Sequence, residues 1–166
     1  MLKKLLLFFA LIVLGYLYIQ PLVFVDDTKA ELPNFEFKKG RSFSLRQFVP
    51  PKSDRIKAYL IIDNDDFSTL PTGIKPYRIL RAKDEALIQQ LLDLKMTFTG
   101  ADIATTSSRL VICANGNLVY EAGVSFDYRP GLQNSSHGWA TFKDEARFIK
   151  ICSQFKRHFS PLLMLN

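Results

Sequence analysis

The sequence contains few residues of the kinds that bind metals or carry redox chemistry. Its 166 residues include two histidines and two cysteines, which lie far apart along the chain. A zinc site needs three or four such ligands, usually at short spacings. The chain also lacks a Cys-x-x-Cys pair, a glycine-rich phosphate loop and a dinucleotide-binding fingerprint. We therefore expect no metal and no cofactor.

Runs of basic residues with interleaved aromatic residues are also missing. The chain has 22 basic and 16 acidic residues, a formal net charge of +6; Lys3 and Lys4 contribute two of these charges, which leaves +4 from Asp26 onwards. A nucleic-acid-binding domain usually concentrates its basic residues in a patch or stripe. The composition therefore predicts no nucleic-acid partner. It is compatible with weak attraction to anionic lipid or to an acidic protein.

One long stretch of the chain lacks charge altogether. From Leu5 to Val25 there is no acidic or basic residue, and most side chains are aliphatic or aromatic. About 20 helical residues cross a hydrocarbon core of about 30 Å, because a helix rises about 1.5 Å per residue. Residues 1–25 are therefore predicted to form a signal-anchor transmembrane helix. Pro21 is expected to end or kink this helix near its far boundary.

The charges that flank this stretch predict its orientation. Lys3 and Lys4 precede it, and Asp26 and Asp27 follow it. Basic residues stay on the cytoplasmic side, so the rest of the chain should lie outside. We expect a bacterial inner-membrane protein whose C-terminal domain lies in the periplasm. The alternatives are a secretory signal, whose cleavage would release the domain into the periplasm, and a buried core helix.

Periodicity in the remaining residues predicts one α+β domain. Residues 26–34 are interpreted as a juxtamembrane linker, and residues 35–166 as the extracytoplasmic domain. Alternating apolar residues predict strands at 35–38, 41–45, 56–62, 77–81, 109–114, 117–126 and 139–142. Helical spacing predicts two principal helices, one over 84–98 and one that ends near 158. Thr141 with Asp144 resembles a capping box at the start of the second helix. Strands in hairpins with helices on one face form an antiparallel sheet with two packed helices.

Both cysteines fall on predicted apolar faces. Asn115-Gly116 predicts a two-residue hairpin, and in this register Cys113 faces Leu118. Leu118 begins the apolar face of the second strand, so Cys113 should point into the same layer. Cys152 lies on the apolar stripe of the last helix. We predict a disulfide between Cys113 and Cys152; the alternative is two buried free thiols.

Two polar clusters are candidates for catalysis. Asp63-Asn64-Asp65-Asp66 follows a hydrophobic strand, where acidic residues can hold Mg²⁺ or Ca²⁺, but the spacing fails the calcium-loop pattern. A solvated acidic turn is the alternative. His137 has several serines nearby in sequence, but a catalytic triad is defined by geometry, and the chain has no Gly-x-Ser-x-Gly elbow. A membrane-tethered, hydrolase-like enzyme is therefore the second hypothesis, and no catalytic residue is assigned.

The segment from 127 to 139 is predicted to be a long loop. Tyr128, Arg129, His137 and Trp139 are its candidate partner-binding residues, because aromatic residues and arginine dominate binding hot spots. The alternative is a plain surface loop whose Trp139 packs into the core. The leading hypothesis is a protein-binding module held at the membrane by residues 5–25. It would act as an immunity-type inhibitor of a toxin or as an accessory subunit of an envelope complex.

Overall fold

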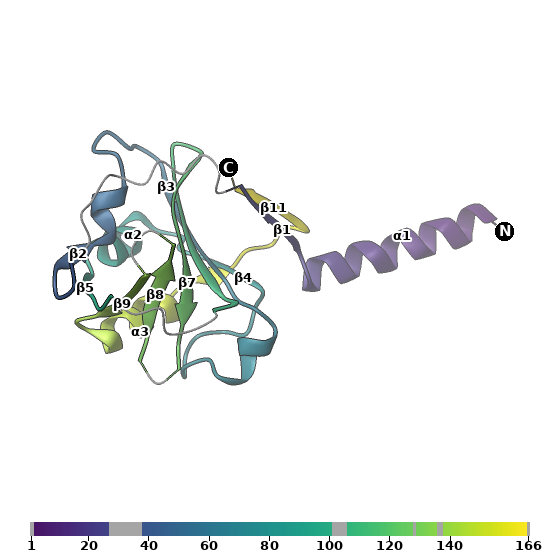
Figure 1. The fold of residues 1–166 in the computed structure, drawn as a ribbon. Helices are drawn as coiled ribbons and strands as arrows, with labels where there is room; N and C mark the ends of the chain where they lie inside the picture. Colours follow the sequence, from purple (N-terminus) through teal and green to yellow (C-terminus); the bar gives the residue numbers. More distant parts are fainter. Residues whose placement is uncertain (1, 27–37, 101–105, 128, 136–137, 166) are drawn as a thin grey trace.

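A long helix projects from an α+β domain in the computed structural model, which describes residues 2–26, 38–100, 106–127, 129–135 and 138–165 (Figure 1). Residues 27–34 of the predicted linker and residues 35–37 of the predicted strand 35–38 lie outside the described residues. The elements are α1 (Leu2–Ile19), β1 (Leu22–Val25), β2 (Ser42–Ser44), η2 (Leu45–Phe48), β3 (Ile56–Ile61), η3 (Asp65–Ser68), β4 (Ile79–Arg81), α2 (Glu85–Leu92), β5 (Lys95–Phe98), β6 (Arg109–Ala114), β7 (Asn117–Ser125), β8 (Gly131–Asn134), β9 (Gly138–Phe142), α3 (Glu145–Ser153), β10 (Lys156–Arg157) and β11 (Leu162–Leu165).

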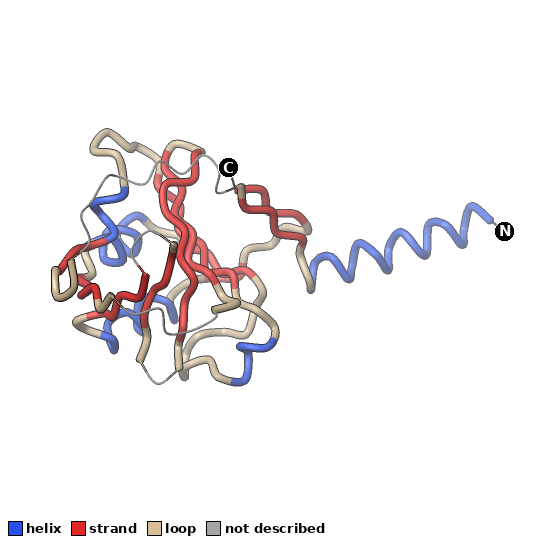
Figure 2. The backbone as a smooth tube through the Cα atoms, in the orientation of Figure 1, coloured by secondary structure: helices blue, strands red, loops and turns tan. Residues whose placement is uncertain are grey.

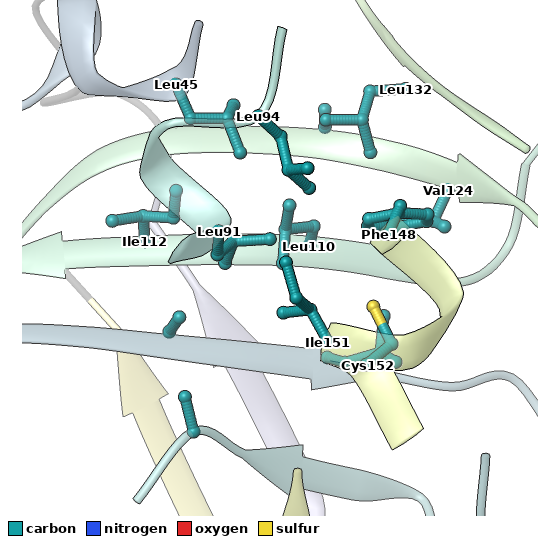
Figure 3. Close-up of a cluster of buried hydrophobic side chains, with 14 of the residues drawn as sticks. Leu45, Leu91, Leu94, Leu110, Ile112, Val124, Leu132, Phe148, Ile151 and Cys152 are labelled. Atoms are coloured by element: carbon teal, nitrogen blue, oxygen red, sulfur yellow. The ribbon is translucent and has the colours of Figure 1, made fainter. Parts of the chain in front are cut away.

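One antiparallel sheet forms the centre of the domain. Within the described residues it has nine strands in the order β10-β4-β3-β6-β7-β8-β9-β5-β2. Side chains of α2, α3 and η2 join those of the sheet in one apolar cluster. Figure 3 shows Leu91 of α2 and Phe148 and Ile151 of α3 close to Leu110 of β6. The predicted α+β architecture, an antiparallel sheet with two packed helices, is confirmed.

Each of the two packed helices begins at an aspartate. The side chain of Asp84 accepts a hydrogen bond from the backbone N–H of Leu87 at 2.7 Å, and that of Asp144 accepts one from Arg147 at 2.9 Å. An aspartate in this position satisfies an N–H that has no partner within the helix. The start of the first helix at Asp84 is as predicted, but the predicted capping box from Thr141 to Asp144 is wrong, because Thr141 lies in β9 and Asp144 is itself the N-cap of α3.

Both helices are shorter than the periodicity predicted. α2 ends at Leu92 rather than near 98, and α3 ends at Ser153 rather than near 158. The residues that follow pair in the sheet, β5 with β9 and β2, and β10 with β4. In β5, Met96 is buried and Lys95 is exposed, so the segment also fits the period of a strand. These segments are strands rather than helix because they pair with other strands of the sheet.

α1 is long and apolar enough to cross a membrane. Its 18 residues have a mean hydropathy of 2.0, and none of them is buried. A buried core helix, one of the alternatives, is therefore excluded. The helix ends at Ile19, two residues before Pro21, and the last predicted anchor residues instead form β1. The predicted helix 1–25 is corrected to a helix that ends at Ile19 and a strand over Leu22–Val25.

β1 and β11 form a parallel ribbon that is separate from the large sheet. Figures 1 and 2 show this ribbon on the side of the domain from which α1 projects. Val23, Val25, Leu163 and Leu165 of the ribbon pack against the face of the sheet that α2 and α3 do not cover. The strands in the middle of the sheet are consequently buried on both faces. The segment next to α1 is thus part of the folded domain.

The two cysteines lie on opposite faces of the sheet. The predicted pairing of Cys113 with Leu118 is confirmed. A bulge at Val119 follows, so that Leu118 and Tyr120 point to different faces. Cys113 faces the ribbon, whereas Cys152 lies in the cluster beneath the helices (Figure 3). Both are buried free thiols, so the structure contradicts the predicted disulfide and agrees with its alternative.

Candidate functional site

Much of the segment predicted to be a partner-binding loop is a β-hairpin, formed by β8 and β9. Trp139 is only 5% exposed, and its ring lies so close to Gly131 that a Cβ added there would be 2.5 Å from it. Trp139 is therefore corrected from a binding residue to a core residue. Arg129 is exposed. Tyr128 and His137 lie outside the described residues.

The acidic residues that follow β3 are engaged in the protein's own structure. Asp63 accepts a hydrogen bond from Arg78 at 3.0 Å, and this bond holds the pKa of Asp63 below its ordinary value. Asp66 accepts hydrogen bonds from the backbone N–H and the hydroxyl of the buried Ser108. No group of three metal-binding side chains occurs in the part of the chain that the structure describes. Asp63 and Asp66 thus tie the turn to β4 and to the start of β6.

A cleft of about 330 Å³ opens at a corner of the sheet, where β4 ends beside β3 and α2 begins. The last residue of β4, Arg81, pairs with Tyr59, so the start of β3 extends beyond the end of β4. The charged residues that line the cleft are Asp54, Arg55, Lys57, Arg81, Lys83 and Glu85. Four cations and two carboxylates give this basic cleft an excess of positive charge, which attracts anionic groups.

A neighbouring histidine lies close to two of the same cations. His158 lies next to Tyr59, with 5.7 Å between the ring centroids. Burial lowers the pKa of His158, and the charges of Arg81 and Lys57 lower it further. Because these two cations disfavour a third positive charge nearby, an anion at the same place would be stabilised.

Arg81 has a buried hydrogen-bond donor that lacks a partner. Among the described side chains, its Nε is the buried polar atom for which no hydrogen bond is found. Its guanidinium carbon lies 5.8 Å from the centre of the Tyr59 ring. A buried donor without a partner costs about 1–3 kcal/mol. Arg81 shares the face of the sheet that carries Tyr59 and Ile79, and its planar group has further nitrogens that can donate to a carboxylate.

The sequence alone did not reveal this cleft. It placed Lys57 and Arg81 on separate predicted strands, at 56–62 and 77–81. The sequence did contain one indication, because Lys57 and Arg81 interrupt strand faces that are otherwise apolar. Lys57 shares its face with Tyr59, and Arg81 shares its face with Ile79. The register that pairs Tyr59 with Arg81 and the position of α2 bring the cleft together, and neither follows from the local pattern.

A second cleft, of about 220 Å³, lies where α1 joins the domain. Arg157 donates a hydrogen bond to the carbonyl oxygen of Tyr18 at 2.6 Å, and its guanidinium carbon is 4.9 Å from the centre of the Tyr77 ring. The side-chain amides of Gln20 and Asn64 donate to each other at 3.4 and 3.3 Å. These contacts attach the end of α1 to the domain.

No family model, curated protein or solved structure gives a significant match to this chain. What the basic cleft binds must therefore be inferred from its own residues and geometry.

Proposed function

We propose that the protein is a membrane-anchored, non-catalytic protein-binding module that receives an acidic group of a partner protein in the basic cleft. α1 crosses the membrane once and the domain faces the periplasm of a bacterial cell, in keeping with the charges on either side of the apolar stretch. The partner is a toxic protein that the module inhibits, or an envelope complex of which it is an accessory subunit.

The excess of cations along the basic cleft, with Arg81 and its unpaired Nε among them, is the observation that carries this proposal. A fold that keeps a donor buried and unpaired gives up stability, which is recovered when a ligand supplies the acceptor. The surrounding cations favour an acidic group as that ligand. Arginine at the centre of a charged contact is also common among the residues that dominate binding energy.

The location of the cleft leaves it accessible beside the anchor. The end of α1 contacts Asn64, which follows the Ile61 end of β3. The basic cleft lies at the Ile56 end of the same strand. A strand rises about 3.3 Å per residue, so the two ends of β3 are about 17 Å apart. A partner can therefore contact the cleft without displacing the helix.

Affinity purification of the full-length chain from detergent-solubilised membranes tests the proposal. Three proteins are compared: the wild type, Lys57→Gln/Lys83→Gln in the basic cleft, and Lys143→Gln/Lys150→Gln. The last is a matched control, because it removes two exposed cations from another part of the domain. We expect one protein to be recovered with the wild type and the control, and about tenfold less of it with the cleft variant, equivalent to about 1.4 kcal/mol.

Salt provides the second readout of the same experiment. A contact between the cleft and an acidic group should weaken as ionic strength rises, because mobile ions screen exposed charges. Equal recovery with the cleft variant and the control, or recovery that is insensitive to salt, would contradict the proposal.

The alternative of a membrane-tethered enzyme has less support. The carboxylates of Asp63 and Asp66 are hydrogen-bonded to Arg78 and Ser108, so their accepting oxygens are already in use within the fold. His137, the other candidate, lies outside the described residues. No observation on the described residues favours this alternative over binding.

A further inference from the structure

The ribbon of β1 and β11 presents an apolar face to the outside of the molecule. Leu22 and Phe24 are 48% and 57% exposed, and Leu162 and Met164 are 45% and 64% exposed. The register pairs Leu22 with Leu162 and Phe24 with Met164, so these four side chains form one contiguous patch, which we call the ribbon patch. Their neighbours in the strands are the residues that pack on the sheet.

The ribbon patch carries no charge of its own. Neither Leu22–Val25 nor Leu162–Leu165 contains an acidic, basic or amide side chain. A contiguous apolar patch on a folded domain usually marks a contact with another protein or with a membrane. Such a patch on a two-stranded ribbon would otherwise expose its side chains to water.

The position of the ribbon patch next to α1 favours a lipid surface as its occupant. Gln20 and Pro21 alone separate α1 from β1, so the patch continues the largely exposed apolar surface of the helix. The 18 residues of α1 extend about 27 Å at about 1.5 Å per residue, slightly less than a hydrocarbon core of about 30 Å. The residues that follow the helix are therefore drawn towards the boundary between headgroups and acyl chains.

Contacts at the end of α1 hold the ribbon close to this boundary. The backbone N–H of Leu22 donates to the carbonyl oxygen of Pro161 at 3.0 Å, which joins β1 to the start of β11. Arg157 bonds to the carbonyl oxygen of Tyr18 and lies 4.9 Å from the ring centre of Phe159, which is 69% exposed. A guanidinium and an exposed aromatic ring are the side chains that favour the headgroup region.

From these observations we propose that the ribbon patch lies in the outer boundary of the bilayer, so that the domain contacts the membrane through β1 and β11 as well as through α1. The lipid supplies the apolar surroundings that the four side chains lack in water. This inference rests on the proposed membrane insertion of α1. It is independent of what the basic cleft binds.

Spin-label accessibility in the full-length chain tests the inference. Phe24→Cys and Met164→Cys are labelled separately with a nitroxide and reconstituted at one copy per nanodisc of phosphatidylcholine and phosphatidylglycerol. Cys113 and Cys152 are buried, and the wild-type chain treated in parallel measures any background labelling. Leu11→Cys reports insertion of α1, and Lys143→Cys reports a water-exposed position on the domain. Circular dichroism establishes that each labelled variant retains its fold.

Labels at positions 24 and 164 should collide readily with oxygen, which partitions into lipid, and poorly with a water-soluble nickel chelate. The label at 143 should show the reverse. If the labels at 24 and 164 collide with the nickel chelate as readily as the label at 143, while the label at 11 collides mainly with oxygen, the lipid contact of the ribbon patch is overturned and membrane insertion of α1 is retained. If position 11 is itself exposed to the chelate, anchoring and lipid contact both fail. Shielding from both reagents would point to contact with protein and would likewise overturn the inference.

Discussion

At the scale of single residues, a substitution of Arg81 should reduce partner binding without reducing the stability of the fold. Its buried Nε has no hydrogen-bond partner among the residues that the structure describes, so replacing the side chain with an apolar one of similar length removes an unsatisfied donor. We expect Arg81→Met to unfold with a free energy within about 1 kcal/mol of the wild type, or higher, because the loss of the contact with Tyr59 offsets part of the gain. In the affinity purification, less of the partner protein should be recovered with the same variant than with the wild type.

Urea unfolding of the detergent-solubilised chain measures the first effect, and affinity purification measures the second. Arg81→Lys is the control, because it retains the positive charge without the planar group of donors. A loss of several kcal/mol in Arg81→Met would mean that Arg81 stabilises the fold, and it would remove the main support for the binding proposal.

His158 should make stability depend on pH in a defined window. Burial and the charges of Arg81 and Lys57 lower its pKa in the folded state below the ordinary value of about 6.5. The unfolded chain therefore binds this proton more readily, and the free energy of unfolding should fall as the pH is lowered from 7.5 through about 6.5.

Unfolding of the wild type and His158→Gln at pH 7.5 and pH 5 checks this dependence, and the variant should lose less stability between the two. Asp63 acts in the same direction but in a lower pH window. Its pKa is lowered by Arg78, so its contribution is present above its ordinary value of about 3.9 and is lost only at lower pH. An equal loss of stability in the wild type and the variant would show that other groups control the window.

Local sequence patterns predicted the position of single residues correctly only where a short motif specifies the backbone conformation. Asn115-Gly116 determined the hairpin turn, and Cys113 therefore pairs with Leu118 as expected. The disulfide prediction failed one step later, because a bulge at Val119 reverses the faces and leaves no local signature. Trp139 looked like a binding residue in a loop and proved to be a core residue of β9.

At the scale of elements, apolar spacing predicted the type of most segments better than their ends. Predicted strands match β2, β3, β4, β6, β7 and β9, and the predicted helices contain α2 and α3. The helix ends were wrong because residues such as Met96 suit both a helix and a strand, and pairing with distant strands decides between them. β1 was missed because its four apolar residues prolong the uncharged run of α1, with Gln20 and Pro21 alone between them.

The ribbon should contribute to stability through one face only. Leu163 is 6% exposed and packs with the sheet, whereas its neighbour Leu162 is 45% exposed. Leu163→Ala is expected to lower the free energy of unfolding by about 2–3 kcal/mol, and Leu162→Ala in detergent by well under 1 kcal/mol. The first variant should also increase the rate at which Cys113 reacts with a thiol reagent.

Urea unfolding and thiol labelling of the two variants measure these effects, and the two leucines are matched in size and strand. Similar losses for both would mean that the ribbon does not pack as the structure shows, and the outward orientation of Leu22, Phe24 and Met164 would then be in doubt.

At the scale of the whole molecule, the fold attaches the α+β domain closely to the apolar helix α1. The segment after α1 pairs with β11 and covers one face of the sheet, so the domain is held close to the helix. The sequence predicted the anchor and the α+β domain but treated them as separate units joined by a linker. α1 is joined to the domain through the parallel pairing of β1 with β11, which are far apart in the sequence, and no local pattern encodes such a pairing.

The most direct test of the central claim is site-specific photo-crosslinking in intact bacterial membranes. A photoreactive residue is placed at Lys83, in the basic cleft, and in a matched chain at Lys143. We expect a discrete adduct with one membrane or periplasmic protein from position 83, its loss when Lys57→Gln and Arg81→Met are added, and no equivalent adduct from position 143. Adducts that are equal at the two positions, or unchanged by the cleft substitutions, would contradict the account.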